Sequence, residues 1–447
     1  MKPRVALSMI VRDAEKDLPR CLESVRGVVD EIVIADTGSS DNTRAIAKAH
    51  QARLLSIAWE NDFSQARNQS LAAVTADWVL MLDADEQLDP AAHESIPTLV
   101  LRSGVSGYMV TIRNYVNDLH ERVWDKPAKV NDSTLESAQA YPAYLEHENV
   151  RLFRRDPRIA FLGRVHETVG HSIQEMGGRL EKADFCIHHF GLTAGPEERT
   201  RKNQFYRELG RRKIAERPGD AQAHFELGLM EFDNFHDFEE ALRCFHRGCE
   251  LNPKLTVSWL FAALACLQMR KYAAALTYIR GAQMQGYCTP LVLETEGDAH
   301  YNLGNYPEAL KVYRRAHEAD PASGGLQSKL AMAELRTGET DTALRRLRRA
   351  LREEGHNPEI HDRLVLALTF TGHLSEAAEA AEAKLATVEP DVTSFMRAAS
   401  IRAKLQEWRK AQASVVAGLQ KFPQSGRLRY ALSEIQASTG QGSNGPP

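Results

Sequence analysis

Two aspartates separated by one small residue, Asp83 and Asp85, follow the apolar run Val79–Leu82. Such an uninterrupted run is typical of a strand that is buried on both faces of a parallel sheet. Because side chains alternate along a strand, Asp83 and Asp85 leave on the same side while Ala84 points the other way. Two carboxylates placed in this way can bind a hard divalent cation together with substrate phosphates. The same residues would also suit a solvated turn, so the rest of the chain has to decide between the two.

A third aspartate, Asp36, ends another apolar strand, Glu31–Ala35, and precedes the polar segment Thr37–Thr43. An acidic residue at the carboxyl end of such a strand commonly accepts hydrogen bonds from the base or ribose of a nucleotide. The motif G-x-G-x-x-G does not follow the first strand, and G-x-x-x-x-G-K-[ST] occurs nowhere in the sequence. The sequence therefore predicts neither the dinucleotide-binding fingerprint nor a P-loop, and a nucleotide would be bound in another way.

A parallel sheet is expected to position these aspartates. The strand Val5–Val11, the helix Leu18–Val28 and the strand Glu31–Ala35 succeed one another, a rhythm typical of parallel strands with crossover helices. Ligands of such open sheets bind beyond the carboxyl ends of the strands, where the aspartates stand. The polar segment Asn117–Asn149 is expected to form a long loop over this edge that takes part in acceptor choice, or else a passive insertion.

Several segments spread over about the first 200 residues carry a common resemblance: Leu7–Glu15, Asp30–Asp41, Trp59–Asn68, L-D-A-D-E at Leu82–Glu86, Arg151–Arg155, Gly163–Glu167 and His189–Gly191. Together, and in this order, they resemble the GT-A type, family 2 inverting glycosyltransferases. One segment departs from the family, because Arg12–Glu15 reads R-D-A-E where related sequences usually show N-E-E. This departure concerns the contacts to the base of the donor.

The resemblance implies both a fold and a site. The N-terminal domain would be an α/β GT-A domain, Rossmann-like with a mostly parallel sheet, that binds a nucleotide-diphosphate sugar. Asp36, Arg67 and Asp83 would bind this donor, with Asp36 near its base. Asp85 and His189 would hold a divalent cation, Mn²⁺ or Mg²⁺, and Asp83 is a candidate third ligand.

Glu167 is the candidate general base. An inverting transfer displaces the nucleotide in one step, so the acceptor must lose its proton as it attacks. A metal-bound carboxylate is unsuitable because its lone pairs are engaged, and Glu86 should face the other way by strand alternation. Glu167 could instead serve only as an ion-pair partner of Arg164 or Arg154. A metalloprotease motif is excluded in the segment His166–His171, because its histidines are five residues apart and not four.

The second half of the chain repeats with a period of 34 residues, at Ala241, Ala275, Ala309, Ala343, Ala377 and Ala411. Mostly bulky residues three positions earlier, and mostly small ones seven positions later, complete the tetratricopeptide (TPR) pattern. Lys384 takes a small-residue position in the fifth unit, where looser packing is expected. The pattern predicts an all-α TPR superhelix of about six units and a terminal helix, with a concave face that can hold an extended peptide or another protein.

These patterns divide the chain into four parts: residues 1–195 as the GT-A domain, 196–220 as a basic linker helix without a site, 221–437 as the TPR repeats and 438–447 as a disordered tail. The 56 Lys and Arg nearly balance the 60 Asp and Glu, so no nucleic-acid partner is expected. No apolar run approaches the roughly 18 residues of a membrane span, and no signal segment is recognised, so a cytoplasmic protein is expected. The six cysteines form no C-x-x-C and are expected to be buried free thiols and not a zinc site or disulfides.

The leading hypothesis is a metal-dependent inverting glycosyltransferase that moves a sugar from a nucleotide diphosphate to a protein or peptide held by the TPR region. The alternative is a TPR interaction scaffold whose N-terminal domain is a degenerate nucleotide-sugar binder. The presence of candidate metal ligands together with a candidate base favours the enzyme, because a binding relic needs no such set.

Overall fold

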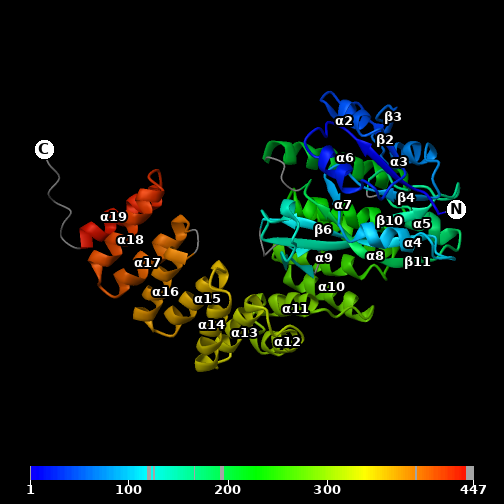
Figure 1. Ribbon diagram of the computed structural model, residues 1–447. Coiled ribbons are helices and arrows are strands. Elements are labelled where there is room, and N and C mark those ends of the chain that lie inside the picture. The colour runs from blue at the N-terminus through cyan, green and yellow to red at the C-terminus, as the bar shows by residue number, and fades with distance from the viewer. Residues whose placement is uncertain are drawn as a thin grey trace. The chain divides into compact units, whose positions relative to one another are not determined.

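The computed structural model describes residues 2–117, 122–123, 126–165, 167–191, 196–387 and 390–438. The chain divides into two compact units, unit 1 (Met1–Asn252) and unit 2 (Pro253–Pro447). Figure 1 draws unit 1 in blue to green and unit 2 in green to red. Unit 1 thus includes helices that follow residue 195, where the sequence pattern changes from strands to helices.

Parallel strands form one half of the sheet in unit 1. β1 (Val5–Val11) pairs with β2 (Glu31–Asp36) on one side and with β4 (Trp78–Met81) on the other, and β2 pairs with β3 (Arg53–Ser56). The crossover helices are α1 (Leu18–Ser24), α2 (Thr43–Ala49) and α3 (Phe63–Ala72). β4 is buried along its whole length, which confirms the interpretation of its apolar run.

The other half of the sheet is mixed. β10 (Ala143–Arg154) runs antiparallel between β4 and β6 (Gly107–Val116), β11 (Leu180–His189) is parallel to β6, and β5 (Glu86–Leu88) is antiparallel to β11. The remaining elements are α4 (Ala92–Leu99), α5 (Gly170–Glu175), β7 (Arg122–Val123), β8 (Lys126–Pro127), β9 (Lys129–Val130) and the short 3-10 helix η1 (Glu136–Ala138). In this register His189 lies opposite Glu86, so β11 brings His189 beside the Asp83–Asp85 segment.

The segment Asn117–Asn149 is not one long loop. Its last seven residues, from Ala143, belong to β10 and pair with β6, and β9 pairs with β10. Four consecutive polar residues, Glu146–Asn149, lie within this strand and make it look like a loop in the sequence. Residues 118–121 and 124–125 of the segment lie outside the described residues.

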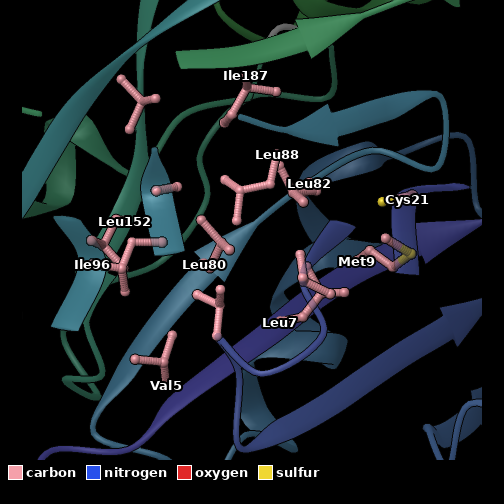
Figure 2. Close-up of a cluster of buried hydrophobic side chains, with 14 of the residues drawn as sticks. Val5, Leu7, Met9, Cys21, Leu80, Leu82, Leu88, Ile96, Leu152 and Ile187 are labelled. Atoms are coloured by element: carbon pink, nitrogen blue, oxygen red, sulfur yellow. The ribbon is translucent and has the colours of Figure 1, made fainter. Parts of the chain in front are cut away.

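Two apolar cores cover the two faces of the sheet. Val5 and Leu7 of β1 belong to one core, drawn in Figure 2, whereas Ala6 belongs to the other. β4 alternates in the same way, with Leu80 in the first core and Val79 in the second. Full burial of one such side chain contributes about 1.5–3 kcal/mol, and a slip by one residue would exchange the faces. The cores therefore fix which residues reach the carboxyl edge.

Further helices complete unit 1: α6 (Pro196–Glu216), α7 (Ala221–Asp233) and α8 (Phe238–Leu251). Polar contacts tie α6 to the segment that precedes Glu167. Arg164 pairs with Glu216 at 2.7 Å. The Lys213 Nζ donates to the Val165 carbonyl at 3.2 Å and pairs with Glu226 of α7 at 2.7 Å. The first helix pair is thus built into the same unit as the sheet.

Unit 2 consists of consecutive helices: α9 (Thr256–Gln268), α10 (Tyr272–Met284), α11 (Pro290–Asn302), α12 (Tyr306–Ala319), α13 (Gly324–Arg336), α14 (Thr340–Glu353), α15 (Pro358–Phe370), α16 (Leu374–Thr387), α17 (Val392–Lys404), α18 (Trp408–Lys421) and α19 (Gly426–Ser438). The alanines of the 34-residue register are fully buried, as the TPR pattern predicts. Lys384 is buried as well, and its Nζ pairs with Asp362 at 2.8 Å. An ion pair therefore accommodates the residue that departs from the small-residue rule. Among the described helices, none is long and apolar enough to cross a membrane.

Candidate functional site

A cavity of about 1390 Å³ opens at the carboxyl ends of β1 and β4 and lies within unit 1. Its lining includes the candidate site residues Arg67, Asp83, Asp85, Glu167 and His189. These residues come from α3, from the segment after β4, from the segment before α5 and from the end of β11. The structure thus brings together side chains that are more than one hundred residues apart in the sequence.

Asp36 does not line the cavity. Its carboxylate is fully buried, and Oδ1 accepts hydrogen bonds from the Gly38 and Ser39 amides, both at 3.0 Å, and from Arg44 Nη2 at 2.8 Å. Burial opposes ionisation of this group, but hydrogen bonds from Arg44 and Ser39 outweigh it and lower the pKa of Asp36. Oδ2 is buried without a partner among the described residues. Asp36 therefore shapes the turn beside Thr37, which does line the cavity.

Arg67 joins two of the candidate residues. Its Nη2 donates to Asp83 Oδ1 at 2.6 Å, and its Nε donates to Glu167 Oε1. Burial would lower the pKa of Arg67, but Asp83 and Glu167 raise it well above its ordinary value. Burial likewise opposes ionisation of Asp83, but Arg67 and Arg151 hold its pKa well below the usual range. The guanidinium thus keeps Asp83 in its charged form and holds both carboxylates in position.

Asp85 and His189 face each other across the cavity edge, with Oδ2 and Nε2 at 3.3 Å. On the other side of the ring, Nδ1 lies 2.7 Å from Asn114 Oδ1. The Asn114 amide nitrogen is already directed to the Leu145 carbonyl at 3.2 Å and to His147 Nδ1 at 2.8 Å. Because Oδ1 can only accept, His189 Nδ1 must carry a proton there. Burial disfavours the imidazolium, but Asp85 outweighs it and raises the pKa of His189.

Gly191 leaves the room that this pair requires. A Cβ at this position would stand 2.1 Å from Asp85 Oδ2 and 2.6 Å from His189 Nε2, closer than atoms can approach without displacement. Asp85 Oδ2 and His189 Nε2 therefore converge beside Gly191, which has no side chain. The second nitrogen of the imidazole is held by Asn114, as is usual for metal-binding histidines. The residues present fit a divalent cation at this position.

Glu86 lies outside the cavity lining. Its side chain is 2% exposed, Oε2 accepts a hydrogen bond from the Asp83 amide at 2.8 Å, and Oε1 pairs with Arg151 at 2.7 Å. Burial raises the pKa of Glu86 above its ordinary value. This carboxylate holds the backbone of the Asp83–Asp85 segment through the Asp83 amide. Because it does not line the cavity, it is not placed to act on an acceptor there.

Glu167 lines the cavity, and its side chain is 10% exposed. Neither arginine that we weighed as its ion-pair partner contacts it. Arg164 pairs with Glu216, and Arg154 donates to the Val105 carbonyl at 2.7 Å. Arg67 holds Oε1, and among the described residues Oε2 has no hydrogen-bond partner. His166, the preceding residue, lies outside the described residues.

The wall of the cavity opposite the strand ends is formed by α6 and α7. Aromatic, apolar, amide and charged residues of these helices and of the C-cap of α7 line the cavity: Lys202, Phe205, Tyr206, Gln222, Phe225, Glu226, Leu229, Met230, Asp233 and Asn234. Tyr206 stacks on Phe63 of α3 with ring centroids 5.9 Å apart. Burial, followed by the charges of Asp83, Glu167 and Asp85, raises the pKa of Tyr206 to about 12. The phenol therefore keeps its proton beside the carboxylates.

The sequence predicts no site in the helix after residue 195, but three of its residues, Lys202, Phe205 and Tyr206, line the cavity. The available signal was Phe205-Tyr206, an aromatic pair in a helix whose other residues are mostly charged or polar. The many charged residues around this pair are typical of a solvated helix. Arg207 and Arg211 pair with Glu231 of α7, whereas Lys202 lines the cavity.

Two kinds of known protein family match this chain. The family described as Glycosyl transferase family 2 matches residues 7–160, and tetratricopeptide repeat families match residues 262–324 and 301–368. The matched glycosyltransferase segment contains Asp36, Arg67, Asp83 and Asp85. It ends before Glu167 and His189, so the assignment of these two residues rests on their geometry.

Several curated proteins are similar to this chain. The TPR repeat-containing protein Synpcc7942_0270 of Synechococcus elongatus is 32% identical over 322 residues, which cover 70% of this chain and 71% of that protein. The SPbeta prophage-derived glycosyltransferase SunS of Bacillus subtilis is 25% identical over 167 residues, 37% of this chain and 34% of that protein. The lipopolysaccharide core biosynthesis glycosyltransferase LpsC of Rhizobium meliloti is 32% identical over 124 residues, 26% and 45% respectively. The chain thus spans less than half the length of the last two.

Proposed function

This chain belongs to glycosyl transferase family 2 and carries tetratricopeptide repeats, and from that premise we propose which reaction its site performs. The reaction is a metal-dependent transfer of a sugar from a nucleotide diphosphate to a protein or peptide, with inversion at the anomeric carbon. One observation carries the proposal. Asp85, His189 and Glu167 open on the same cavity, and Arg67 bridges Asp83 and Glu167 beside them.

The donor is bound at the strand ends. Asp85 and His189 would hold a divalent cation, which when bound would neutralise the charge that develops on the departing diphosphate. The imidazole ligand favours Mn²⁺ over Mg²⁺, because Mg²⁺ prefers oxygen ligands. Arg67 and Arg151 line the same cavity, and each has a buried Nη1 without a partner among the described residues. These donors are in place before the anion arrives, so their orientation adds no cost during the reaction.

Glu167 accepts the proton of the attacking acceptor group. Its Oε2 has no partner among the described residues, while Oε1 is held by Arg67. Arg67 divides its charge between Glu167 and Asp83 and fixes the direction of the oxygen that has no partner among the described residues. A positioned base of this kind typically contributes about 10²- to 10⁴-fold to the rate.

A protein or peptide acceptor suits the wall formed by α6 and α7. The side-chain amides of Gln222 and Asn234 can hydrogen-bond an extended backbone, and Phe225 and Leu229 offer apolar contacts to alternate side chains. The printed name of LpsC refers to lipopolysaccharide core biosynthesis, so a glycan is the competing acceptor class. A glycan would use polar and stacking groups and would leave much of the apolar wall unused.

A panel of nucleotide sugars tests the proposed reaction directly. The full chain is incubated with each donor and Mn²⁺, with Mg²⁺ or with EDTA, and the released nucleotide diphosphate is measured. We expect release from one donor in the presence of Mn²⁺ and none in EDTA. Unchanged release in EDTA would remove the metal from the mechanism, and no release from any donor would favour the TPR scaffold with a degenerate nucleotide-sugar-binding domain.

The acceptor class is tested separately, by the intact masses of proteins in a lysate treated with the active donor. Once an acceptor is known, a chain that ends at Asn252 is compared with the full chain. We expect equal donor hydrolysis and a KM for the acceptor raised at least about tenfold, because the repeats of unit 2 offer further surface to an extended chain. An unchanged KM would assign unit 2 another task, and sugar transfer only to glycans would exclude the peptide.

A further inference from the structure

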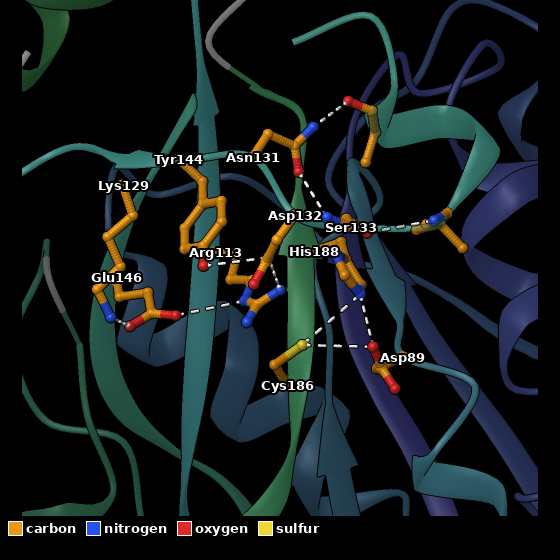
Figure 3. Close-up of polar contacts among 12 residues, drawn as sticks. Asp89, Arg113, Lys129, Asn131, Asp132, Ser133, Tyr144, Glu146, Cys186 and His188 are labelled. Carbon is orange, nitrogen blue, oxygen red and sulfur yellow. Dashed lines mark hydrogen bonds and ion pairs between the residues drawn. The ribbon is translucent and has the colours of Figure 1, made fainter. Parts of the chain in front are cut away.

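Three side chains that commonly bind metals meet on the other face of β11 from His189. Cys186 and His188 alternate with His189 along the strand and therefore point away from the cavity. Asp89 follows β5, the partner of β11. The Cys186 Sγ lies 3.5 Å from Asp89 Oδ2 and 3.6 Å from His188 Nε2, and these last two atoms are 2.9 Å apart. Figure 3 shows the three side chains converging.

The arrangement is not that of a thiol nucleophile activated by histidine. In such a relay the nucleophile and the carboxylate occupy different nitrogens of the imidazole. Here Asp89 and Cys186 both meet Nε2, while the other nitrogen, Nδ1, lies 2.8 Å from the Tyr115 hydroxyl. Three candidate ligand atoms thus converge, and the Tyr115 hydroxyl holds the imidazole at its other nitrogen. An outer partner on the second nitrogen is typical of a metal-binding histidine.

The triangle of atoms has the dimensions of one face of a tetrahedral zinc site. With zinc bonds of about 2.3 Å to sulfur and about 2.0–2.1 Å to nitrogen and oxygen, tetrahedral angles place the ligand atoms about 3.3–3.6 Å apart. The two separations that involve Cys186 Sγ, 3.5 and 3.6 Å, match this range. The third, 2.9 Å, is that of the hydrogen bond between His188 and Asp89, and it needs to open by only a few tenths of an ångström.

A divalent cation would balance the charge of this set of ligands. Burial, followed by Asp89, raises the pKa of Cys186 to about 12. Arg113 is engaged by other carboxylates, because it pairs with Glu146 at 3.3 Å and with Asp132 at 3.2 Å (Figure 3). A thiolate and a carboxylate together carry two negative charges, which one divalent ion neutralises.

We propose that Asp89, Cys186 and His188 form a second metal site in unit 1, which binds Zn²⁺ and is separate from the site of the catalytic cation. Thiolate and imidazole ligands select zinc over Mg²⁺ or Mn²⁺. The Asp89 side chain is 25% exposed, so water can reach the fourth position. Binding forms the sulfur–zinc bond and releases the thiol proton to solvent. The ion ties β11, which carries His189, to the segment after β5.

This site was not expected from the sequence, where the lack of C-x-x-C favoured free thiols. All six cysteines are free, and Cys186 is the one that lies beside His188 and Asp89. Its ligands come from a C-x-H triplet on one strand and from an aspartate almost one hundred residues earlier. The proposal does not depend on the proposed function.

Cobalt replaces zinc in such sites and reports its ligands. We titrate the full chain, carrying Cys288→Ser to remove the exposed thiol, with Co²⁺. One equivalent should produce a thiolate-to-cobalt charge-transfer band in the near ultraviolet and the visible bands of tetrahedral cobalt, and Zn²⁺ should abolish both. The catalytic site has no sulfur ligand, so Asp85→Asn should leave the charge-transfer band unchanged.

Cys186→Ser should lose the band, whereas Cys249→Ser, a matched change of a buried cysteine, should keep it. Tyr115→Phe should weaken Zn²⁺ binding by about 10- to 100-fold, as loss of an outer-shell partner typically does. If Cys186→Ser does not fold, Asp89→Asn on the partly exposed ligand must weaken Zn²⁺ binding more than Tyr115→Phe does. The absence of the band in the chain with Cys186 intact, or an equal band in Cys186→Ser, would overturn the proposal.

Discussion

The two sides of the cavity are built by different means. The proposed donor side consists of charged groups at strand ends: Asp83 pairs with Arg67 and Arg151, and Asp85 pairs with His189. The proposed acceptor side consists of the α6 and α7 wall, with aromatic, apolar, amide and a few charged groups. A short loop after a buried strand can be defined by local sequence, whereas a wall between two helices depends on how the helices dock.

On this assignment, the acceptor side should tolerate substitutions better than the donor side. The donor side allows few substitutions, because each charged group has a partner that would be left buried and unpaired. The acceptor wall offers contacts that can be replaced singly at the cost of about one hydrogen bond or one apolar contact. Mutations on the two sides should therefore differ in the size of their effect and in the kinetic constant that they change.

The largest effect is expected on the donor side, for Asp85→Asn. The variant loses the carboxylate that would hold the cation, and the charge stabilisation at stake is several kcal/mol, which corresponds to about 10³-fold or more in kcat/KM. Glu94→Gln, the same carboxylate-to-amide change at an exposed site of α4, is the control. A loss below about tenfold, with a normal melting curve, would contradict the assignment of Asp85.

A smaller effect is expected where the two sides are joined, for Lys213→Met. The change leaves Glu226 and the Val165 carbonyl without their buried donor, which should lower the free energy of unfolding by about 1.5–3 kcal/mol. Because Val165 is close to Glu167 in the chain, we expect kcat to fall about tenfold while the donor Kd, measured by calorimetry, stays the same. Arg212→Met, which removes an exposed ion pair on the same helix, should change neither. Equal effects of the two variants would show that α6 does not position Glu167.

The smallest effect is expected on the acceptor side, for Tyr206→Phe. Only a hydroxyl is lost, and the stacking on Phe63 remains. One hydrogen bond to the acceptor corresponds to about a two- to tenfold rise in the acceptor KM. The donor Kd should not move. Weaker donor binding with an unchanged acceptor KM would place Tyr206 on the donor side and would contradict the proposed division of the cavity into a donor side and an acceptor side.

Much of the fold could be predicted from the sequence, because periodicity records burial. The apolar run before Asp83 gave a strand buried on both faces, and the 34-residue register gave the buried alanines of the repeats. The mixed half of the sheet could not be predicted in this way. β10 carries polar residues within a long strand and crosses between β4 and β6, a pairing that no local pattern encodes.

The candidate site also contains residues that local sequence predicts and residues that depend on how distant elements pack. Asp83 and Asp85 could be found because their spacing carries a geometric meaning, and His189 and Glu167 were reached through the resemblance. The ion-pair partner of Glu167 is Arg67 and neither Arg164 nor Arg154, the two partners considered as the alternative to a base role; a pairing across one hundred residues depends on how α3 docks. The contribution of α6 and α7 was missed for the same reason.

The central claim is that Glu167 takes the acceptor's proton while Arg67 holds it in position, and Glu167→Gln tests this most directly. The amide keeps the shape and can still accept the Arg67 hydrogen bond, but it is not a base. We measure the donor Kd by calorimetry and kcat with a saturating acceptor, with Glu148→Gln at the rim of the cavity as the control. The account predicts an unchanged Kd and a kcat reduced at least about a hundredfold. A turnover near that of the unmodified protein, or loss of donor binding with kcat retained, would contradict it.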